Sequence, residues 1–248
     1  MSAKSRRRTN KPAAAPVRRV RKVGLARRLI GRLVLAIVIV ILMPVALLPV
    51  YSKINPPITT VMIAKRVAGA SIIKAWQPIA AISPHLVRAV IVAEDARFCA
   101  HSGIDWRQVE EVLLDPEDGG PLRGASTITM QTVKNLFLWS GRSWLRKGLE
   151  VPLALYAEAV LSKRRIMEIY LNVAEWDKGI YGAQAAARHY FGVSAAHLSA
   201  AQAARMAATL PAPLLRNPAR PSRAVGRLAG LYARRAEVSG PYVACVLN

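Results

Sequence analysis

Apolar residues along most of the chain recur at spacings of three and four, the pattern of α-helices that bury one face. Ser83 is a good N-cap and Pro84 suits the first helical position, and apolar residues follow at helical spacing as far as Phe98. Glu94 is an acid on this apolar stripe. Further helices are expected over residues 126–138, 143–162, 163–173 and 182–190, and after 199. No stretch alternates convincingly as strands do, so we expect a mainly α-helical domain.

An apolar stretch near the N-terminus predicts a membrane anchor. Residues 33–50 carry no charge and would span roughly 27 Å as a helix. Adding residues 29–32, where the Arg32 side chain can snorkel, gives about 33 Å, which is enough to cross a bilayer. A cleaved signal peptide should have a shorter apolar region that ends in a small-x-small site, and none precedes Tyr51. The uncleaved anchor is therefore favoured, with a kink at Pro44.

Basic residues gather before this apolar stretch. The formal net charge is +22, and residues 1–32 hold 12 of the 36 Lys and Arg but no Asp or Glu. By the positive-inside rule, this end stays in the cytoplasm. We therefore expect a basic cytoplasmic tail over 1–28, a transmembrane helix over 29–50 and an external domain over 51–248. The positive surplus suits nucleic acid, anionic lipid or a phosphorylated substrate, and charge alone does not choose among them.

The chain has two cysteines, Cys99 and Cys245, which are too few for a disulfide framework or a Cys-rich metal site. They can pair in an oxidising compartment or remain two buried thiols. The sequence leaves both alternatives open.

Glu94 opens the first segment with candidate chemistry, EDARFCAHSGID. A carboxylate on a buried stripe costs free energy unless it is paired or borders a cleft. Partial burial raises the pKa of such a carboxyl towards the range that suits general acid or base catalysis. The structural alternative is an ion pair at the end of the helix.

The second segment is RGASTITMQTVKNLF. Arg123 precedes Ser126 and Thr127 at an expected helix N-terminus, and Lys134 and Asn135 follow two turns later. Free backbone N–H groups, hydroxyls and two cations near one helix start favour an anion site, for which phosphate is the obvious ligand. An ordinary capped helix is the alternative.

The third segment, RSWLRKGLE, places Arg146, Lys147 and Glu150 at spacings of three and four, so that they can share one helix face. Surface ion pairs often give this pattern. The functional alternative is a second carboxylate held among cations, beside a phosphate or a metal ion. Spacing alone does not decide between them.

Taken in order, EDARFCAHSGIDW, GASTITMQTVKNLF, RKGLE and KRRIMEIYLN with GIYGAQAAARHYFG resemble the successive motifs of glycosyltransferase family 51, and in particular its monofunctional peptidoglycan transglycosylases. The resemblance covers roughly residues 60–220. It implies a lysozyme-like, two-lobed α-helical glycosyltransferase domain whose cleft opens at the membrane. It also implies polymerisation of lipid II into β-1,4-linked glycan strands, with release of undecaprenyl pyrophosphate, on the periplasmic side of the bacterial inner membrane.

Residue by residue, the resemblance implies that Glu94 is the general base and that Glu150 is a second catalytic carboxylate. The substrate-binding residues that it implies are Asp95, Phe98, His101, Arg123, Ser126, Thr127, Gln131, Lys134, Asn135, Arg146 and Lys147. It further implies Mg²⁺ or Mn²⁺ bound with the substrate's pyrophosphate, with Glu150 as a candidate ligand. Met130 departs from the family, which usually has a glutamine there, so an amide is expected to be missing from the edge of the site.

Three other interpretations of the sequence are a transpeptidase, a glycan hydrolase and an inactive scaffold. The SIIK stretch beginning at Ser71 matches the nucleophile pattern of a transpeptidase, but no KTG or SDN motif follows. A glycan hydrolase needs one protonated Glu as acid, which leaves the basic phosphate-handling segment unexplained. An inactive scaffold is favoured only by Met130. The expected partners are lipid II, the nascent glycan strand and inner-membrane lipid, with other cell-wall synthases as candidates and nucleic acid excluded.

Overall fold

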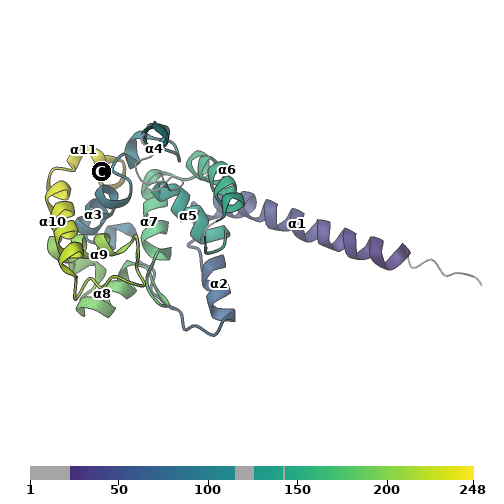
Figure 1. The fold of residues 1–248 in the computed structure, drawn as a ribbon, viewed down its shortest axis with the longest axis horizontal. Helices are drawn as coiled ribbons and strands as arrows, with labels where there is room; N and C mark the ends of the chain where they lie inside the picture. The colour runs from purple at the N-terminus through teal and green to yellow at the C-terminus, as the bar shows by residue number, and fades with distance from the viewer. Residues whose placement is uncertain (1–22, 115–125, 142) are drawn as a thin grey trace, which may run out of the picture. The chain divides into compact units, whose positions relative to one another are not determined.

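The computed structural model describes residues 23–114, 126–141 and 143–248 (Figure 1). Arg123, which is expected at the phosphate site, lies outside the described residues, as does most of the predicted basic tail. The chain divides into two units, Met1–Leu42 and Met43–Asn248, and the first contains most of helix α1 (Val23–Tyr51).

Helix α1 coincides with the predicted anchor but does not confirm that it crosses a membrane. Within the described residues, no helix combines the length and the apolar character that a bilayer span requires. The last two turns of α1 belong to the second unit, where Leu48 is fully buried. There the hydroxyl of Tyr156 donates to the carbonyl of Val45 at 3.0 Å. The C-terminal end of α1 is therefore part of the folded domain.

The second unit is built mainly from helices, as the periodicity predicts. Its α-helices are α2 (Thr60–Val67), α3 (Pro84–Glu94), α4 (Trp106–Leu114), α5 (Ile128–Phe137), α6 (Trp144–Val160), α7 (Lys163–Val173), α8 (Ala183–Phe191), α9 (Ala200–Thr209), α10 (Arg223–Glu237) and α11 (Gly240–Leu247). Short 3₁₀ turns cover Ile79–Ala81, Phe98–Ala100 and Ala195–His197. The capping box of Ser199 and Gln202 is present at the start of α9. Helix α6 runs unbroken through Pro152.

A small sheet corrects the expectation of a domain without strands. It joins β1 (Ile73–Lys74), β2 (Glu175–Asp177) and β3 (Ile180–Tyr181) in the order β1-β3-β2. Strand β1 pairs parallel with β3, and β2 pairs antiparallel with it. Strands of two or three residues are too short for alternation to be visible in the sequence. Gly179 is required at this junction because its φ is +78° and a Cβ there would lie 2.1 Å from the carbonyl oxygen of Ser71.

Two groups of helices frame the segments with candidate chemistry. Helix α3 packs against α9 and α10, whereas α5 packs against α6 and α7 (Figure 1). The apolar face of α3 is completely buried at Leu86, Val87, Val90 and Ile91, which fixes the helix that ends at Glu94.

The two cysteines, left open by the sequence, are paired. The disulfide between Cys99 and Cys245 links the turn after α3 to the C-terminal helix α11, with a Cα–Cα distance of 5.7 Å. The turn that follows Glu94 is thus covalently tied to the end of the chain.

Candidate active site

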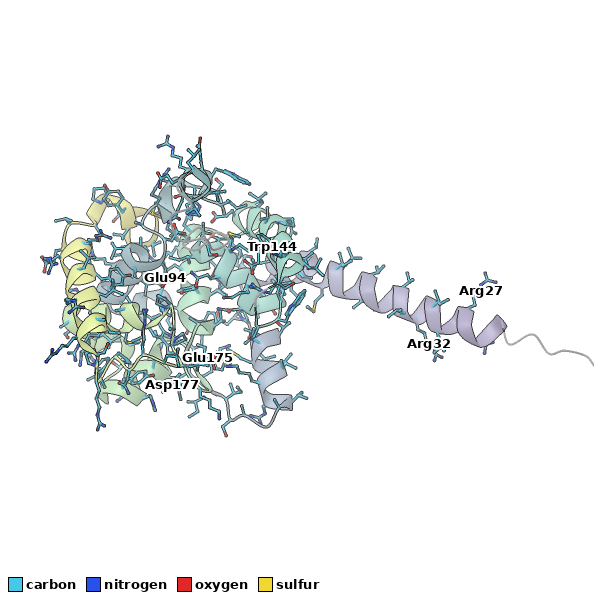
Figure 2. The ribbon with its side chains drawn as sticks, viewed as in Figure 1. Arg27, Arg32, Glu94, Trp144, Glu175 and Asp177 are labelled. Atoms are coloured by element: carbon cyan, nitrogen blue, oxygen red, sulfur yellow. A yellow bond between two sulfur atoms is a disulfide. The ribbon has the colours of Figure 1, made fainter. Side chains whose placement is uncertain are left out.

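Glu94 is the last residue of α3 and is labelled in Figure 2. Its Oε2 accepts a hydrogen bond from the side-chain amide of Gln131 on α5 at 2.9 Å. Its Oε1 is buried and has no hydrogen-bond partner among the described residues. Burial raises the pKa of Glu94 and the charge of Asp95 adds to this, while the Gln131 hydrogen bond and the charges of Lys134 and Arg216 oppose it. The net direction is upward, which suits a group that accepts a proton from a substrate.

Asp95 holds the end of α3 against the start of α5. Its carboxylate, 4% exposed, accepts from Nε2 of His101 at 2.9 Å and from the backbone N–H of Ile128 at 2.9 Å. Ile128 is the first residue of α5, where a negative charge is stabilised by the helix dipole. The contacts of Asp95 and His101 are with protein groups, and they place Glu94 beside Gln131. Direct substrate binding by Asp95 or His101 stays a prediction.

Phe98 supports the site from the core, which corrects its predicted place against the substrate. Its side chain is fully buried, and Nζ of Lys163 lies 4.4 Å from the ring centre. Lys163 pairs with Glu158 at 2.7 Å, and Glu158 accepts from the hydroxyl of Thr129 on α5 at 2.6 Å. This set of buried and half-buried side chains joins the turn after α3 to α5, α6 and α7.

In the second segment, RGASTITMQTVKNLF, some side chains cap helix α5 and others contact the cations. Thr127 is the N-cap of α5 and also donates to the carbonyl of Gly103 at 2.6 Å, so its hydroxyl is used within the protein. Ser126 accepts a hydrogen bond from Lys147 at 2.6 Å. Asn135, on the next turn from Gln131, is half-buried. Of the two hydroxyls predicted to bind phosphate, Ser126 lies among the cations and Thr127 caps the helix.

Met130 does not lie at the edge of the site. Its side chain is 3% exposed and belongs to the hydrophobic core. The residue that contacts Glu94 is the next one, Gln131. The methionine at position 130 therefore leaves the Gln131 amide that contacts Glu94 in place, and its predicted position at the edge of the site is wrong.

Helices α5 and α6 together present the cationic cluster, which we define as Lys134 of α5 and Arg146 and Lys147 of α6. Glu150 is 2% exposed and accepts from Arg146 and, at 3.2 Å, from Lys147. Burial, followed by the charges of Arg146 and Lys134, lowers the pKa of Lys147 to about 8. Arg146 and Lys147 thus share one carboxylate, and Lys134 forms no ion pair within the described residues, which leaves an excess of positive charge for an anionic ligand.

Lys134 connects this cluster to Glu94. Burial and the charge of Arg146 lower the pKa of Lys134, while the charge of Glu94 raises it. The pKa of Lys134 therefore depends both on Glu94, the candidate base, and on Arg146 of α6. Glu94, Gln131, Ser126, Glu150 and the cationic cluster, all predicted from the sequence, are brought into one electrostatically linked set.

Metal binding by Glu150 stays a prediction, and its present contacts are with cations. Each of its oxygens already accepts from a cation, Arg146 or Lys147. In the described part of the chain, no three His, Cys, Asp or Glu side chains gather as a metal site. The divalent cation, expected to bind together with the substrate's pyrophosphate, stays a prediction.

Tyr170 and Tyr232 lie near the site, although the sequence analysis did not select them. The hydroxyl of Tyr170, fully buried on α7, donates to Oε1 of Gln131 at 3.2 Å and so orients the amide that binds Glu94. Burial and the charge of Glu94 raise the pKa of Tyr232 on α10. Both tyrosines stand on the apolar faces of helices, where nothing in the sequence separates them from ordinary core residues.

Residues in and between the KRRIMEIYLN and GIYGAQAAARHYFG segments support the fold. The side-chain oxygen of Asn172 accepts from the backbone N–H of Gln77 at 2.8 Å, and its amide donates to the carbonyls of Gln77 and Glu168. Glu175 pairs with Lys65. Gly182 has a φ of +83°, and a Cβ there would lie 2.9 Å from the carbonyl oxygen of Asn172.

The two described hollows lie away from Glu94. One, of about 380 Å³, is lined by residues of β1, β3 and α8, including Ile73 and Gln184. The other, of about 320 Å³, lies among α3, α9 and α10 and is lined by His85 and Arg88. The cleft implied by the resemblance therefore stays a prediction.

The fold and the site belong to a helical protein in which a buried carboxyl with a raised pKa is linked electrostatically to a cationic cluster. Residues 62–237 match the family described as Transglycosylase. A biosynthetic peptidoglycan transglycosylase of Brucella suis is 59% identical over 211 residues, which cover 85% of this chain and 94% of that protein. Its namesake from Agrobacterium fabrum is 51% identical over 223 residues, or 90% and 99% of the two chains. The chain belongs to the transglycosylase family.

Proposed function

We propose that this chain polymerises lipid II by an inverting transfer in which Glu94 is the general base. As a member of the transglycosylase family, the chain is a peptidoglycan glycosyltransferase, an enzyme of bacterial cell-wall synthesis that joins disaccharide units into glycan strands. The proposal concerns how its residues perform that reaction.

The observation that carries the proposal is the buried Oε1 of Glu94, which has no hydrogen-bond partner among the described residues. The charge of Lys134, a member of the cationic cluster, acts on the same carboxylate. Oε1 of Glu94 takes the proton from the acceptor's 4-hydroxyl. The oxygen of that hydroxyl forms a bond to the anomeric carbon of the growing strand, and the bond from this carbon to undecaprenyl pyrophosphate breaks. The leaving pyrophosphate keeps the electron pair, and attack from the opposite face inverts the anomeric configuration, giving a β-1,4 linkage.

The cationic cluster has a matching role in this step. Negative charge grows on the leaving pyrophosphate, and Lys134, Arg146 and Lys147 stabilise it with charges that are already in place. Glu150 fixes the geometry of Arg146 and Lys147 and does not itself move a proton, since its oxygens accept from both cations. The hydroxyl oxygen of Ser126 also accepts a hydrogen bond from Lys147, which helps to fix that side chain. A divalent cation would enter with the pyrophosphate, whose oxygens are its natural ligands.

The setting of the domain forms part of the proposal. The group of α3, α9 and α10 and the group of α5, α6 and α7 would be the two lobes of a lysozyme-like fold. The enzyme acts at the periplasmic face of the inner membrane, to which the N-terminal apolar segment attaches it. The disulfide between Cys99 and Cys245 supports an oxidising compartment such as the periplasm. Release of the protein from isolated membranes by carbonate would contradict the integral attachment.

The test of the function is direct. Purified full-length chain in detergent is incubated with lipid II, with and without Mg²⁺, and the products are separated by length. Long glycan strands and free undecaprenyl pyrophosphate support the proposal. Shortening of glycan made beforehand would indicate a hydrolase, and an absence of turnover under both conditions would indicate a scaffold.

A further inference from the structure

The hydroxyl of Tyr170 is a buried group with a single hydrogen-bond partner in the described part of the chain. Tyr170 lies on α7 and is 1% exposed. Its hydroxyl contacts Oε1 of Gln131 at 3.2 Å, and no second acceptor lies within hydrogen-bond distance of it among the described residues. A carboxamide oxygen accepts and does not donate, so the hydroxyl is the donor in this contact. The only acceptor for the hydroxyl proton is therefore Gln131.

Gln131 of α5 carries this constraint to Glu94. The two ends of its side-chain amide differ, because Oε1 accepts and Nε2 donates. With Oε1 on Tyr170, Nε2 faces Glu94 and donates to Oε2 at 2.9 Å. A hydrogen bond to an ionised carboxylate is stronger than one to a neutral carboxylic acid, so this contact favours the charged form of Glu94.

The opposite orientation of the Gln131 amide would favour the neutral acid. Turned over, it would present Oε1 to Glu94, which suits a protonated carboxyl that donates to it, and Nε2 to Tyr170. The hydroxyl proton of Tyr170 would then lose its acceptor in a buried place, which costs more than an ordinary hydrogen bond contributes. Burial, followed by the charges of Glu94 and Asp95, raises the pKa of Tyr170, so the hydroxyl keeps that proton. Tyr170 thus holds the amide in the orientation that favours an ionised Glu94.

We propose that Tyr170 is a positioning residue for the transfer reaction, which fixes the Gln131 amide so that Glu94 stays ionised, and able to accept a proton, further into the acid range. The inference rests on the proposed function, in which Glu94 is the general base. It adds a residue of α7 to a site otherwise built from α3, α5 and α6. The other titratable or charged groups that interact with Glu94 are unchanged when the hydroxyl is removed: Asp95 after α3, Lys134 of α5, Arg216 between α9 and α10, and Tyr232 of α10.

The experiment measures kcat/KM for lipid II against pH with full-length protein in detergent. Tyr170→Phe removes only the hydroxyl, and the acid limb should move to higher pH by about one unit, which corresponds to one unsatisfied buried group. The rate at pH 5.5 should therefore fall up to about tenfold, whereas kcat at pH 8 should stay within about twofold of wild type. Tyr190→Phe is the matched control, because its hydroxyl donates to the carbonyl of Trp176 in β2. The acid limb of this control should coincide with that of wild type.

A double-variant cycle tests whether Tyr170 acts through Gln131. Gln131→Leu removes the amide, so adding Tyr170→Phe to it should move the acid limb no further. Replacing Tyr170 by 4-fluorophenylalanine fills the space of the hydroxyl without a proton to donate, and should displace the acid limb as Phe does. An acid limb of Tyr170→Phe at the wild-type position, or a further displacement in the double variant, would overturn the proposal.

Infrared titration of the Glu94 carboxyl gives a readout that needs no turnover. The band should titrate at higher pH in Tyr170→Phe than in wild type, and an unmoved band would contradict the role of Tyr170 while leaving the proposed function intact. Turnover of lipid II by the wild type tests the proposed function separately. Thermal unfolding checks that each variant is folded, and the 4-fluorophenylalanine variant carries the test if Tyr170→Phe is not.

Discussion

Glu94 and Glu150 are both buried carboxylates within one electrostatically linked set, yet their surroundings are opposite. Glu94 ends a helix, where the dipole disfavours negative charge. One of its oxygens accepts from a neutral amide, and the other has no hydrogen-bond partner within the part of the chain that the structure describes. Glu150 lies inside α6 with Arg146 on one oxygen and Lys147 on the other. A base needs a free lone pair and a pKa that is not too low, whereas a positioning group needs fixed partners. The contrast therefore supports the proposal that Glu94 transfers the proton and that Glu150 arranges the cations.

The largest expected effect comes from removing the base. Glu94→Gln keeps the shape of the side chain but cannot accept the proton, so kcat for lipid II polymerisation should fall by at least about 10³-fold. The midpoint of thermal unfolding should stay at or above that of wild type, because the variant removes a carboxylate from a site whose burial disfavours its charge. Turnover within tenfold of wild type would mean that another group is the base.

Glu150→Gln should harm both folding and catalysis. It leaves Arg146 and Lys147 without their shared carboxylate, which should lower the free energy of unfolding by about 1–3 kcal/mol, discounted for the partial exposure of Lys147. We expect kcat to fall on the order of 10²-fold as the cations lose their geometry. The acid limb of the pH profile should stay where it is in wild type. A displaced acid limb would contradict the division of roles between the two carboxylates.

Gln131→Leu sharpens the comparison by changing the pKa of one carboxylate. The hydrogen bond from Gln131 lowers the pKa of Glu94, so its loss should raise that pKa further. A base with a higher pKa is protonated over more of the acid range, and the acid limb of kcat/KM should therefore move to higher pH. Activity should fall more at pH 5.5 than at pH 8, as measured by initial rates across this range. An equal loss at every pH would show that Gln131 acts only on the fold.

The smallest effect is expected at Lys147. Its pKa of about 8 means that it carries charge below that pH and loses the charge as the pH rises through it. The alkaline limb of kcat/KM in wild type should therefore lie near this value. Lys147→Arg keeps the charge at alkaline pH and should move that limb upward, with a rate at pH 7 within about fivefold of wild type. An alkaline limb that does not respond would indicate that Lys147 is not the group that titrates.

Residue spacing predicted the helices well because their caps are local: Ser199 with Gln202 and Pro84 act within a few residues of themselves. The strands were not predicted, because segments of two or three residues are too short to show an alternation of apolar and polar positions. Motif order identified Glu94 and the cationic cluster as parts of one site. It did not show that Phe98 and Met130 face the core, nor that Arg216 acts on Glu94, because these facts depend on how distant helices pack.

The central claim is that the carboxyl of Glu94 has a raised pKa and is the group whose ionisation starts the transfer. Infrared difference spectroscopy of wild type against Glu94→Gln isolates its carboxyl band, which can be titrated alongside kcat/KM. The band should titrate above the ordinary glutamic acid value of 4.5 and at the same pH as the acid limb of kcat/KM. A carboxyl that titrates at or below that value, or apart from the acid limb, would contradict the assignment of Glu94 as the base.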